Sequence, residues 1–303
     1  MPNSAPRPWR MFLPLGVVLL LALLWSGYWL MASASAKQRL AELRGELASE
    51  GLKLACTQEQ WGGYPFHLEF TCTSPILTYG SGSELRAANL LLVALAYAPW
   101  QIAALVDGPS TITAPGLLPT QIMHQRALGA VTIGRDGQPS ISAELPAVSV
   151  DGFGRAEKVM LFTRPASDGA TDVAVQAKSL VYTPVGQDPV AVDAARLQGT
   201  IESNETLTLQ TFEINQDTLR YWGSGKLSLD QQGHISGQID TETNDAKALL
   251  VRISPLLGLS EGQLANLQTV LNLIGNGAKM PVIAKDGKLY LGPFQIAELK
   301  SLY

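Results

Sequence analysis

The sequence predicts a mainly β fold with α, in which an N-terminal transmembrane helix leads into an elongated, curled antiparallel β-sheet with two C-terminal helices packed on it. Three observations predict this architecture. An apolar run lies near the N-terminus, apolar and polar residues alternate from residue 52 to about 240, and two stretches with helical spacing follow. The expected segments are 1–10, a cytoplasmic N-terminus; 11–31, the transmembrane helix; 32–51, a juxtamembrane amphipathic helix; and 52–303, an exported antiparallel β domain.

The first element is the run Met11–Met31, which has 21 residues and no charge. As a helix it would be about 31 Å long, which matches the hydrocarbon core of a bilayer. Arg7 and Arg10 precede it, so the positive-inside rule places that end in the cytoplasm and the body of the chain outside. Three aromatic residues crowd the far end, where an aromatic belt belongs: Trp25, Tyr28 and Trp29.

A cleaved secretory signal is the competing interpretation of this run. Small residues at 31–36, "MASASA", offer cleavage sites. The apolar core of a signal peptide usually has about 7–15 residues, so the length of this run favours a retained anchor. Either interpretation exports the body of the chain.

The second element, 32–51, has a narrow apolar stripe at helical spacing, with Gly51 as its stop. The stripe consists of Ala36, Leu40, Leu43 and Leu47. This helix could lie on the bilayer surface, but a narrow stripe of ordinary core residues favours packing on the domain that follows.

The third element holds the two cysteines of the chain, Cys56 and Cys72. In a strand from residue 66 onward, Leu68, Phe70 and Cys72 share the apolar face, and His67 points the other way. That facing argues against a metal site, which would need three or four convergent ligands. A disulfide is favoured over two free buried thiols. We expect a loop centred on Tyr64 that sets Cys56 opposite Cys72, and a stabilisation of about 3 kcal/mol from the bridge.

In the remaining body, the alternation of apolar and polar residues predicts roughly a dozen strands with turn signals between them. The segments "RDGQ", "DQQGH" and "KDGK" fit hairpin turns. Helices are expected near 244–255, with Asn244 as the cap, and near 260–275, where Ser260 and Gln263 form a capping box. A final hairpin ends the chain.

No catalytic, cofactor-binding or metal-binding residue is predicted, and the protein is not expected to be an enzyme. The three histidines lie far apart in the sequence, and no nucleophile and base occur at a known spacing. A net charge of −4 without clustered Lys and Arg argues against nucleic acid as a partner. An envelope hydrolase would be favoured only if a His, a Ser and an Asp converged in the fold.

One motif carries a resemblance to a known family: Gly63, Tyr64, Pro65 and Phe66, followed by Cys72. With the N-terminal anchor and the late segment "DGKLYLGP", it resembles an uncharacterised domain-of-unknown-function family of membrane-anchored alphaproteobacterial proteins. The layout is more distantly similar to AsmA-like envelope proteins. That similarity implies a bacterial inner-membrane location, a periplasmic body and lipid handling, with no catalytic residues to carry over.

A curled sheet with one apolar face would leave acyl-sized surface open unless the C-terminal helices cover it completely. The alternation leaves both outcomes open. The candidate groove residues are Leu68, Phe70, Leu207, Leu209, Leu227 and Leu229. We therefore expect a protein that binds or passes lipid or another apolar molecule, with the bilayer and a lipid ligand as partners. The alternative is a structural or assembly factor that binds another envelope protein, without a ligand.

Overall fold

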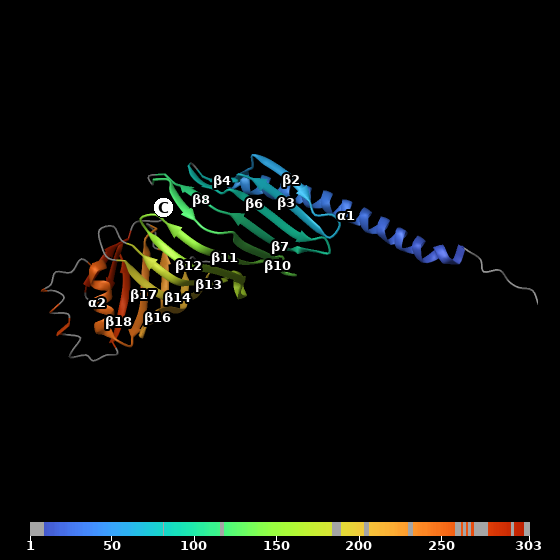
Figure 1. Cartoon of the computed structure of the whole chain (residues 1–303). Coiled ribbons are helices and arrows are strands. Elements are labelled where there is room, and N and C mark those ends of the chain that lie inside the picture. Colours follow the sequence, from blue (N-terminus) through green and yellow to red (C-terminus); the bar gives the residue numbers. More distant parts are fainter. Residues whose placement is uncertain are drawn as a thin grey trace, which may run out of the picture.

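In the computed structural model, a long N-terminal helix leads into one elongated, twisted antiparallel sheet (Figure 1). The residues that the structure describes are 9–80, 82–115, 118–183, 189–202, 206–229, 233–257, 262, 265, 268–269, 278–291 and 294–299. The prediction of a mainly β chain with an apolar N-terminal helix and an unclosed sheet is confirmed. The number of strands was underestimated, because the described sheet has 20 strands.

Helix α1 (Trp9–Ser49) is continuous, so the segments expected at 11–31 and 32–51, the second continuing from the first, form a single helix. Its part Phe12–Ser49 has a mean hydropathy of 2.0 in its most apolar window and is long enough to cross a membrane. The small residues at 31–36 are no barrier to helix formation, so nothing interrupts the helix there. The helix ends where expected, because Gly51 adopts a φ of 88°, which favours glycine.

Fifteen strands follow one another in a single antiparallel path, each paired with its neighbour in the order given. These are β2 (Gln58–Gly62), β3 (His67–Thr73), β6 (Asn89–Leu95), β7 (Ala98–Asp107), β10 (Ala127–Ile133), β11 (Pro139–Val150), β12 (Gly154–Pro165), β13 (Thr171–Tyr182), β14 (Val190–Ile201), β15 (Leu207–Gln216), β16 (Leu219–Leu229), β17 (Ile235–Thr243), β18 (Ala278–Lys285), β19 (Lys288–Leu291) and β20 (Phe294–Glu298). The predicted hairpins at "RDGQ" and "KDGK" join β10 to β11 and β18 to β19. Strands β16 and β17 also pair, but residues 230–232 of the predicted turn "DQQGH" lie outside the described residues.

A second path forks from this sheet at β11. The first half of β11 pairs with β10, but its end pairs with β9 through Ser149 and Met123. The path then continues from β9 to β8, β5, β4 and β1. These strands are β1 (Leu52–Ala55), β4 (Ile76–Tyr79), β5 (Ser83–Arg86), β8 (Ser110–Thr113) and β9 (Thr120–Met123). The N-terminal half of the domain therefore has two branches, and the C-terminal half is a single layer.

The disulfide between Cys56 and Cys72 connects the two branches, and its prediction is confirmed. The predicted register was wrong, because the residue opposite Cys72 in the ladder is Glu59. Strand β1 does not pair with β3; it pairs with β4 in the other branch. Cys56 follows the end of β1, so the bridge ties one branch to the other.

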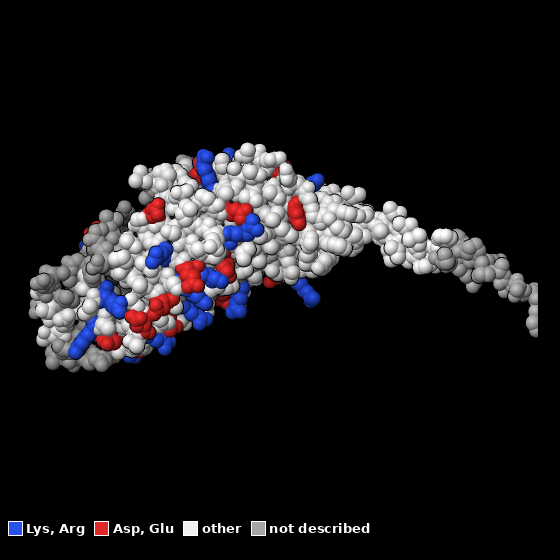
Figure 2. All heavy atoms as spheres, viewed as in Figure 1, with Lys and Arg blue, Asp and Glu red and all other residues white. Residues whose placement is uncertain are grey.

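The long sheet has one apolar and one charged face. On the apolar face, directly paired residues form a row across nine strands. The row consists of Phe70, Leu92, Ala104, Gly129, Ala143, Leu161, Val175, Leu197 and Phe212. The charged face carries cross-strand ion pairs, and Figure 2 shows their charges interspersed over β11–β18. The pairs are Lys158–Glu144, Arg164–Asp172, Arg220–Glu213 and Lys279–Glu242.

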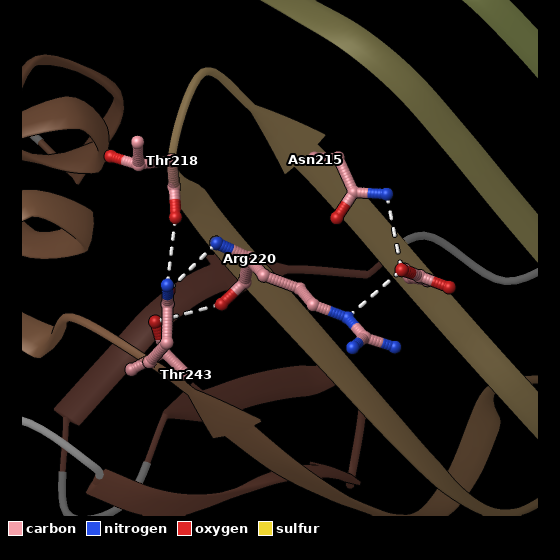
Figure 3. A network of polar contacts seen from close by, with 6 residues as sticks. Asn215, Thr218, Arg220 and Thr243 are labelled. Atoms are coloured by element: carbon pink, nitrogen blue, oxygen red, sulfur yellow. Dashed lines mark hydrogen bonds and ion pairs between the residues drawn. The ribbon is translucent and has the colours of Figure 1, made fainter.

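Helix α2 (Ala246–Leu257) packs on the C-terminal end of the sheet, close to the expected position. Its N-cap is Asp245, whose carboxylate accepts from the backbone N–H of Lys247 and of Ala248, so the predicted cap Asn244 was wrong. The amide of Asn244 instead binds the turn between β15 and β16, donating to the carbonyl oxygen of Thr218 at 2.7 Å and accepting from the backbone N–H of Arg220 at 2.8 Å. Figure 3 shows Thr218 and Arg220 with the neighbouring Thr243, whose hydroxyl donates to the carbonyl oxygen of Arg220 at 3.1 Å.

Most of the second predicted helix, 260–275, and its capping box lie outside the described residues. Residues 262, 265, 268 and 269, which are described, are helical.

Candidate apolar binding site

The loop between β2 and β3 fastens α1 to the end of the sheet. Its residues Gly63, Tyr64, Pro65 and Phe66 are the motif on which the resemblance rests. The indole nitrogen of Trp25 donates to the carbonyl oxygen of Pro65 at 2.9 Å, and the hydroxyl oxygens of Ser26 and Tyr64 lie 2.8 Å apart. The ring of Trp25 is also 6.1 Å from that of Phe66.

One helical turn further on, two more aromatic residues of α1 reach the ends of β3 and β6. The indole nitrogen of Trp29 donates to the carbonyl oxygen of His67 at 2.8 Å, and the hydroxyl of Tyr28 donates to the carbonyl oxygen of Ala96 at 2.7 Å. Residues that the sequence assigned to an aromatic belt thus also satisfy backbone acceptors at the end of the sheet. The sequence offered no signal for this pairing, because donor and acceptor are 38 residues apart for Trp29 and 68 for Tyr28.

Near its C-terminal end, α1 is held by cationic side chains. The guanidinium of Arg44 pairs with Glu59 at 2.9 Å and lies 5.2 Å from the ring centre of Phe70. The ammonium of Lys37 lies 5.7 Å from the ring centre of Trp61. These contacts hold the helix above the apolar face, where the predicted packing of 32–51 on the domain is observed.

Between these two attachments, α1 and the sheet line an open cavity of about 500 Å³. The helix lines it with small and aliphatic side chains: Ala32, Ser35, Ala36, Leu40 and Leu43. The sheet lines it with apolar side chains from β2, β3, β6 and β7: Trp61, Leu68, Phe70, Leu92, Ala94 and Ile102. Because the helix presents alanine and serine here, it leaves space that larger side chains would fill. Arg39 is the charged residue among the lining residues.

A second cavity, of about 380 Å³, lies between α2 and the sheet. Its lining includes Ile214, Tyr221, Leu249, Ile253, Val282 and Leu291. Burial raises the pKa of the Tyr221 phenol, although its hydroxyl also donates to Thr241 at 2.9 Å. Helix α2 therefore covers only one end of the apolar face.

Between the two cavities the apolar face is half-exposed. Leu161, Val175 and Leu197 of the central strands are each partly accessible, not buried. Few apolar side chains in the described residues are fully buried, and those in the sheet lie mainly at its two ends. The described part of the chain thus contains no closed core along the middle of the sheet.

The six predicted groove residues divide between these regions. Leu68 and Phe70 are buried and line the first cavity. The other four lie on the apolar face of β15 and β16, but none of them lines either cavity. Of these, Leu209 is buried, while Leu207, Leu227 and Leu229 are half-buried.

A further hollow, of about 660 Å³, lies on the charged face over β10–β14. Its lining mixes polar and apolar residues, and the polar ones include Thr132, Ser142, Arg164, Asp172, Gln176 and Gln198. The hydroxyl of Thr200 and the guanidinium of Arg164 bind the Asp172 carboxylate and lower its pKa. These polar groups satisfy one another across the strands, so this surface suits water better than an apolar ligand.

A serine and a histidine do meet, at the ends of β8 and β9. The hydroxyl of Ser110 lies 2.8 Å from Nε2 of His124, whose Nδ1 lies 2.6 Å from the carbonyl oxygen of Gln125. The nearby carboxylate of Asp107 is paired with Arg126 at 2.7 Å, a hydrogen bond that lowers its pKa. A nucleophile also needs access to substrate, and Ser110 is only 7% exposed. The pair therefore lacks a carboxylate partner and an open approach.

Among the described residues, no three His, Cys, Asp or Glu side chains gather as metal ligands. A family model described as "Uncharacterized protein conserved in bacteria" (DUF2125) matches residues 29–300, nearly the whole chain. No curated protein and no solved structure matches the chain.

Proposed function

We propose that this chain, which belongs to the bacterial protein family DUF2125, is a membrane-anchored envelope protein that binds or passes lipid on the apolar face of its sheet. The observation that carries the proposal is the cavity of about 500 Å³ between α1 and the sheet. It falls within the usual range for ligand sites, about 300–1,000 Å³, and its lining is apolar as such sites are.

The half-exposed middle of the apolar face supports the same proposal. Among the described residues this apolar strip is only partly covered, and large exposed apolar patches on soluble proteins often mark ligand or membrane contacts. The first cavity lies at one end of this strip and the second at the other. An acyl chain leaving the first cavity would find apolar side chains along the row from Ala143 to Phe212.

A retained anchor is supported by the contacts of α1. Cleavage at 31–36 would remove Trp25, Tyr28 and Trp29, which donate hydrogen bonds to the end of the sheet. It would also remove part of the lining of the first cavity. We therefore place the chain in the bacterial inner membrane as a single-pass protein, with the N-terminus in the cytoplasm and the disulfide-bonded body in the oxidising periplasm.

The test is a pair of tryptophan substitutions on one helix. Ala36→Trp places a bulky side chain in the first cavity, whereas Ala34→Trp adds the same side chain at an exposed position outside it. Full-length protein would be extracted in mild detergent, and bound lipid would be measured by native mass spectrometry after organic extraction. We expect lipid with the unmodified chain and with Ala34→Trp, and a severalfold loss with Ala36→Trp. Absence of lipid from all three proteins would overturn the proposal.

An assembly role is the second candidate, and the open sheet supports it. In the described residues, the edge strand β2 pairs only with β3, and β20 only with β19. Such edges can accept a strand from another protein. Crosslinking in membranes through residues of β2 or β20 would then trap a defined envelope protein, and Ala36→Trp would leave that partner unchanged.

A further inference from the structure

We infer that the end of the sheet around the β2–β3 loop, named here the docking loop (Gly63, Tyr64, Pro65 and Phe66), lies in the membrane interface, so that the first cavity opens toward the bilayer and not toward the aqueous space. The surface, named here the aromatic rim, consists of Tyr28, Tyr64, Phe66, Tyr97 and Trp100. The position of the rim in the membrane interface requires that α1 spans the membrane. Only the entry of lipid into the first cavity from the bilayer rests on the proposed function.

The rim is assembled from three segments far apart in the sequence. Tyr64 and Phe66 come from the β2–β3 loop, which Trp25 and Trp29 hold against α1. Tyr97 lies in the turn between β6 and β7, and this turn is tied to the helix by the bond from Tyr28 to Ala96. The backbone N–H of Ala96 also donates to the carbonyl oxygen of Phe66 at 2.9 Å, which joins the turn to the loop.

Trp100 reaches this surface through an irregularity in the ladder. Ala94 pairs with Ile102, but the next residue, Leu95, pairs with Ala98. The residues Pro99, Trp100 and Gln101 are therefore extra on β7, and all three are exposed. The bulge displays a large aromatic side chain beside the turn, where a regular strand would have continued the ladder.

The rim is exposed, aromatic and uncharged. Its outer side chains are half or more accessible: Trp100 50%, Phe66 55%, Tyr97 58% and Tyr64 59%. Residues 87–106, which include Tyr97 and Trp100, hold no charged side chain, and neither do residues 60–68. Aromatic side chains of this kind are enriched at the level of lipid headgroups, where one end of the ring system is apolar and the other is wet.

The position of the rim along α1 identifies its occupant. Trp29 lies 20 residues beyond Trp9, where the helix begins, and that length corresponds to about 30 Å of helix, the thickness of a bilayer core. A helix that spans the membrane with the first half of its length thus brings the rim to the far interface. Tyr28, Ala96 and Pro99 also line the first cavity, so that cavity meets the bilayer at the same level.

The experiment uses full-length protein in liposomes with an environment-sensitive NBD fluorophore on a single introduced cysteine. Tyr97→Cys places the label on the rim. Tyr79→Cys is the matched control, because Tyr79 is similarly exposed, at 63%, but lies near the other end of α1. Its neighbour Gly80 donates its backbone N–H to the carbonyl oxygen of Gly51, which follows the end of α1. That site is about 33 Å further along the helix than Trp29. One labelled thiol per chain confirms that Cys56 and Cys72 remain paired.

At position 97 we expect emission shifted to shorter wavelength and strong quenching by phosphatidylcholine brominated near the headgroup, with neither change at position 79. Equal, water-like emission at both sites would overturn the inference. Trp100→Cys provides a second rim site if the first variant does not fold. Lipid extraction from the unmodified chain separates the two claims. Quenching at the rim without bound lipid would support the position of the rim in the membrane interface and overturn the lipid-binding proposal. Bound lipid with water-like emission at the rim would support lipid binding and overturn the position of the rim.

Discussion

The indole nitrogen of Trp29 donates a hydrogen bond to the carbonyl oxygen of His67 at 2.8 Å, and this bond joins the anchor helix to the first residue of β3. The same ring packs edge-on against Tyr64, with ring centres 5.3 Å apart. A residue that the sequence predicts to lie in the membrane interface therefore also orients the sheet relative to α1. Helix and sheet are held as one body, and the first cavity depends on that arrangement.

Trp29→Phe should weaken this attachment while keeping an aromatic ring beside Tyr64. Loss of the N–H donor leaves the carbonyl of His67 without this partner, and we expect a loss of about 0.5–1.5 kcal/mol in the free energy of unfolding. The measurement is denaturant unfolding of the full chain in detergent. Leu23→Phe, an exposed change in the apolar part of α1, is the control and should leave the free energy unaltered.

Replacing both Cys56 and Cys72 with serine should lower the free energy of unfolding by about 3 kcal/mol, because the bridge closes a loop with a sequence separation of 16 residues. Unfolding in urea under non-oxidising conditions measures the change. Reduction of the unmodified protein should reproduce it. A double variant as stable as the unmodified chain would mean that the two branches of the sheet hold together without the bridge.

Gly63→Ala should destabilise the docking loop. Gly63 adopts a φ of 97°, and a Cβ atom there would lie 2.6 Å from the carbonyl oxygen of His67. Strain of this kind costs about 1–3 kcal/mol. The neighbouring Gly62 is a matched control, since a Cβ atom added there has no neighbour within 4 Å. We expect a lower melting temperature for Gly63→Ala than for Gly62→Ala; equal values would refute the role of this backbone conformation.

Acid should weaken the sheet through Asp172. Hydrogen bonds from Thr200 and Arg164 lower its pKa in the folded protein, so the ionised carboxylate favours folding. This contribution is present above the unfolded pKa of about 4 and is lost as the pH falls through the folded value. Asp172→Asn should therefore reduce stability at pH 7 and show a smaller loss between pH 7 and pH 3. Asp151→Asn, at an exposed turn, should retain the full acid dependence.

Ser110 should behave as a structural residue. Ser110→Ala removes the partner of His124 Nε2, and we expect a loss of about 1–3 kcal/mol in stability. The unmodified protein should not react with a fluorophosphonate probe directed at nucleophilic serines. Labelling that disappears in Ser110→Ala would instead indicate a catalytic serine and favour the hydrolase that the sequence did not support.

Local patterns predicted much of the fold. Strict alternation in β3 places Leu68, Phe70 and Cys72 on one face, and the structure confirms it, because side chains alternate along any strand. The sequence also located the turn at Asp286 and Gly287, since both residues tolerate positive φ. The cap of α2 was missed by one residue, because Asn244 and Asp245 have similar local chemistry and only contacts with Thr218 and Arg220 distinguish them.

By itself, the sequence determined an apolar helix of membrane length, a predominantly antiparallel sheet with one apolar face, and the pairing of its two cysteines. These features follow from composition and from the spacing of apolar residues, which recur every two residues in a strand and every 3.6 in a helix. Both are properties of short segments. Only the tertiary structure decided that β1 joins a separate branch, that the Gly63–Phe66 loop docks α1, and that alanine and serine on that helix leave a cavity over Phe70. Those outcomes depend on contacts between residues tens of positions apart, and no local period encodes which partners such residues choose.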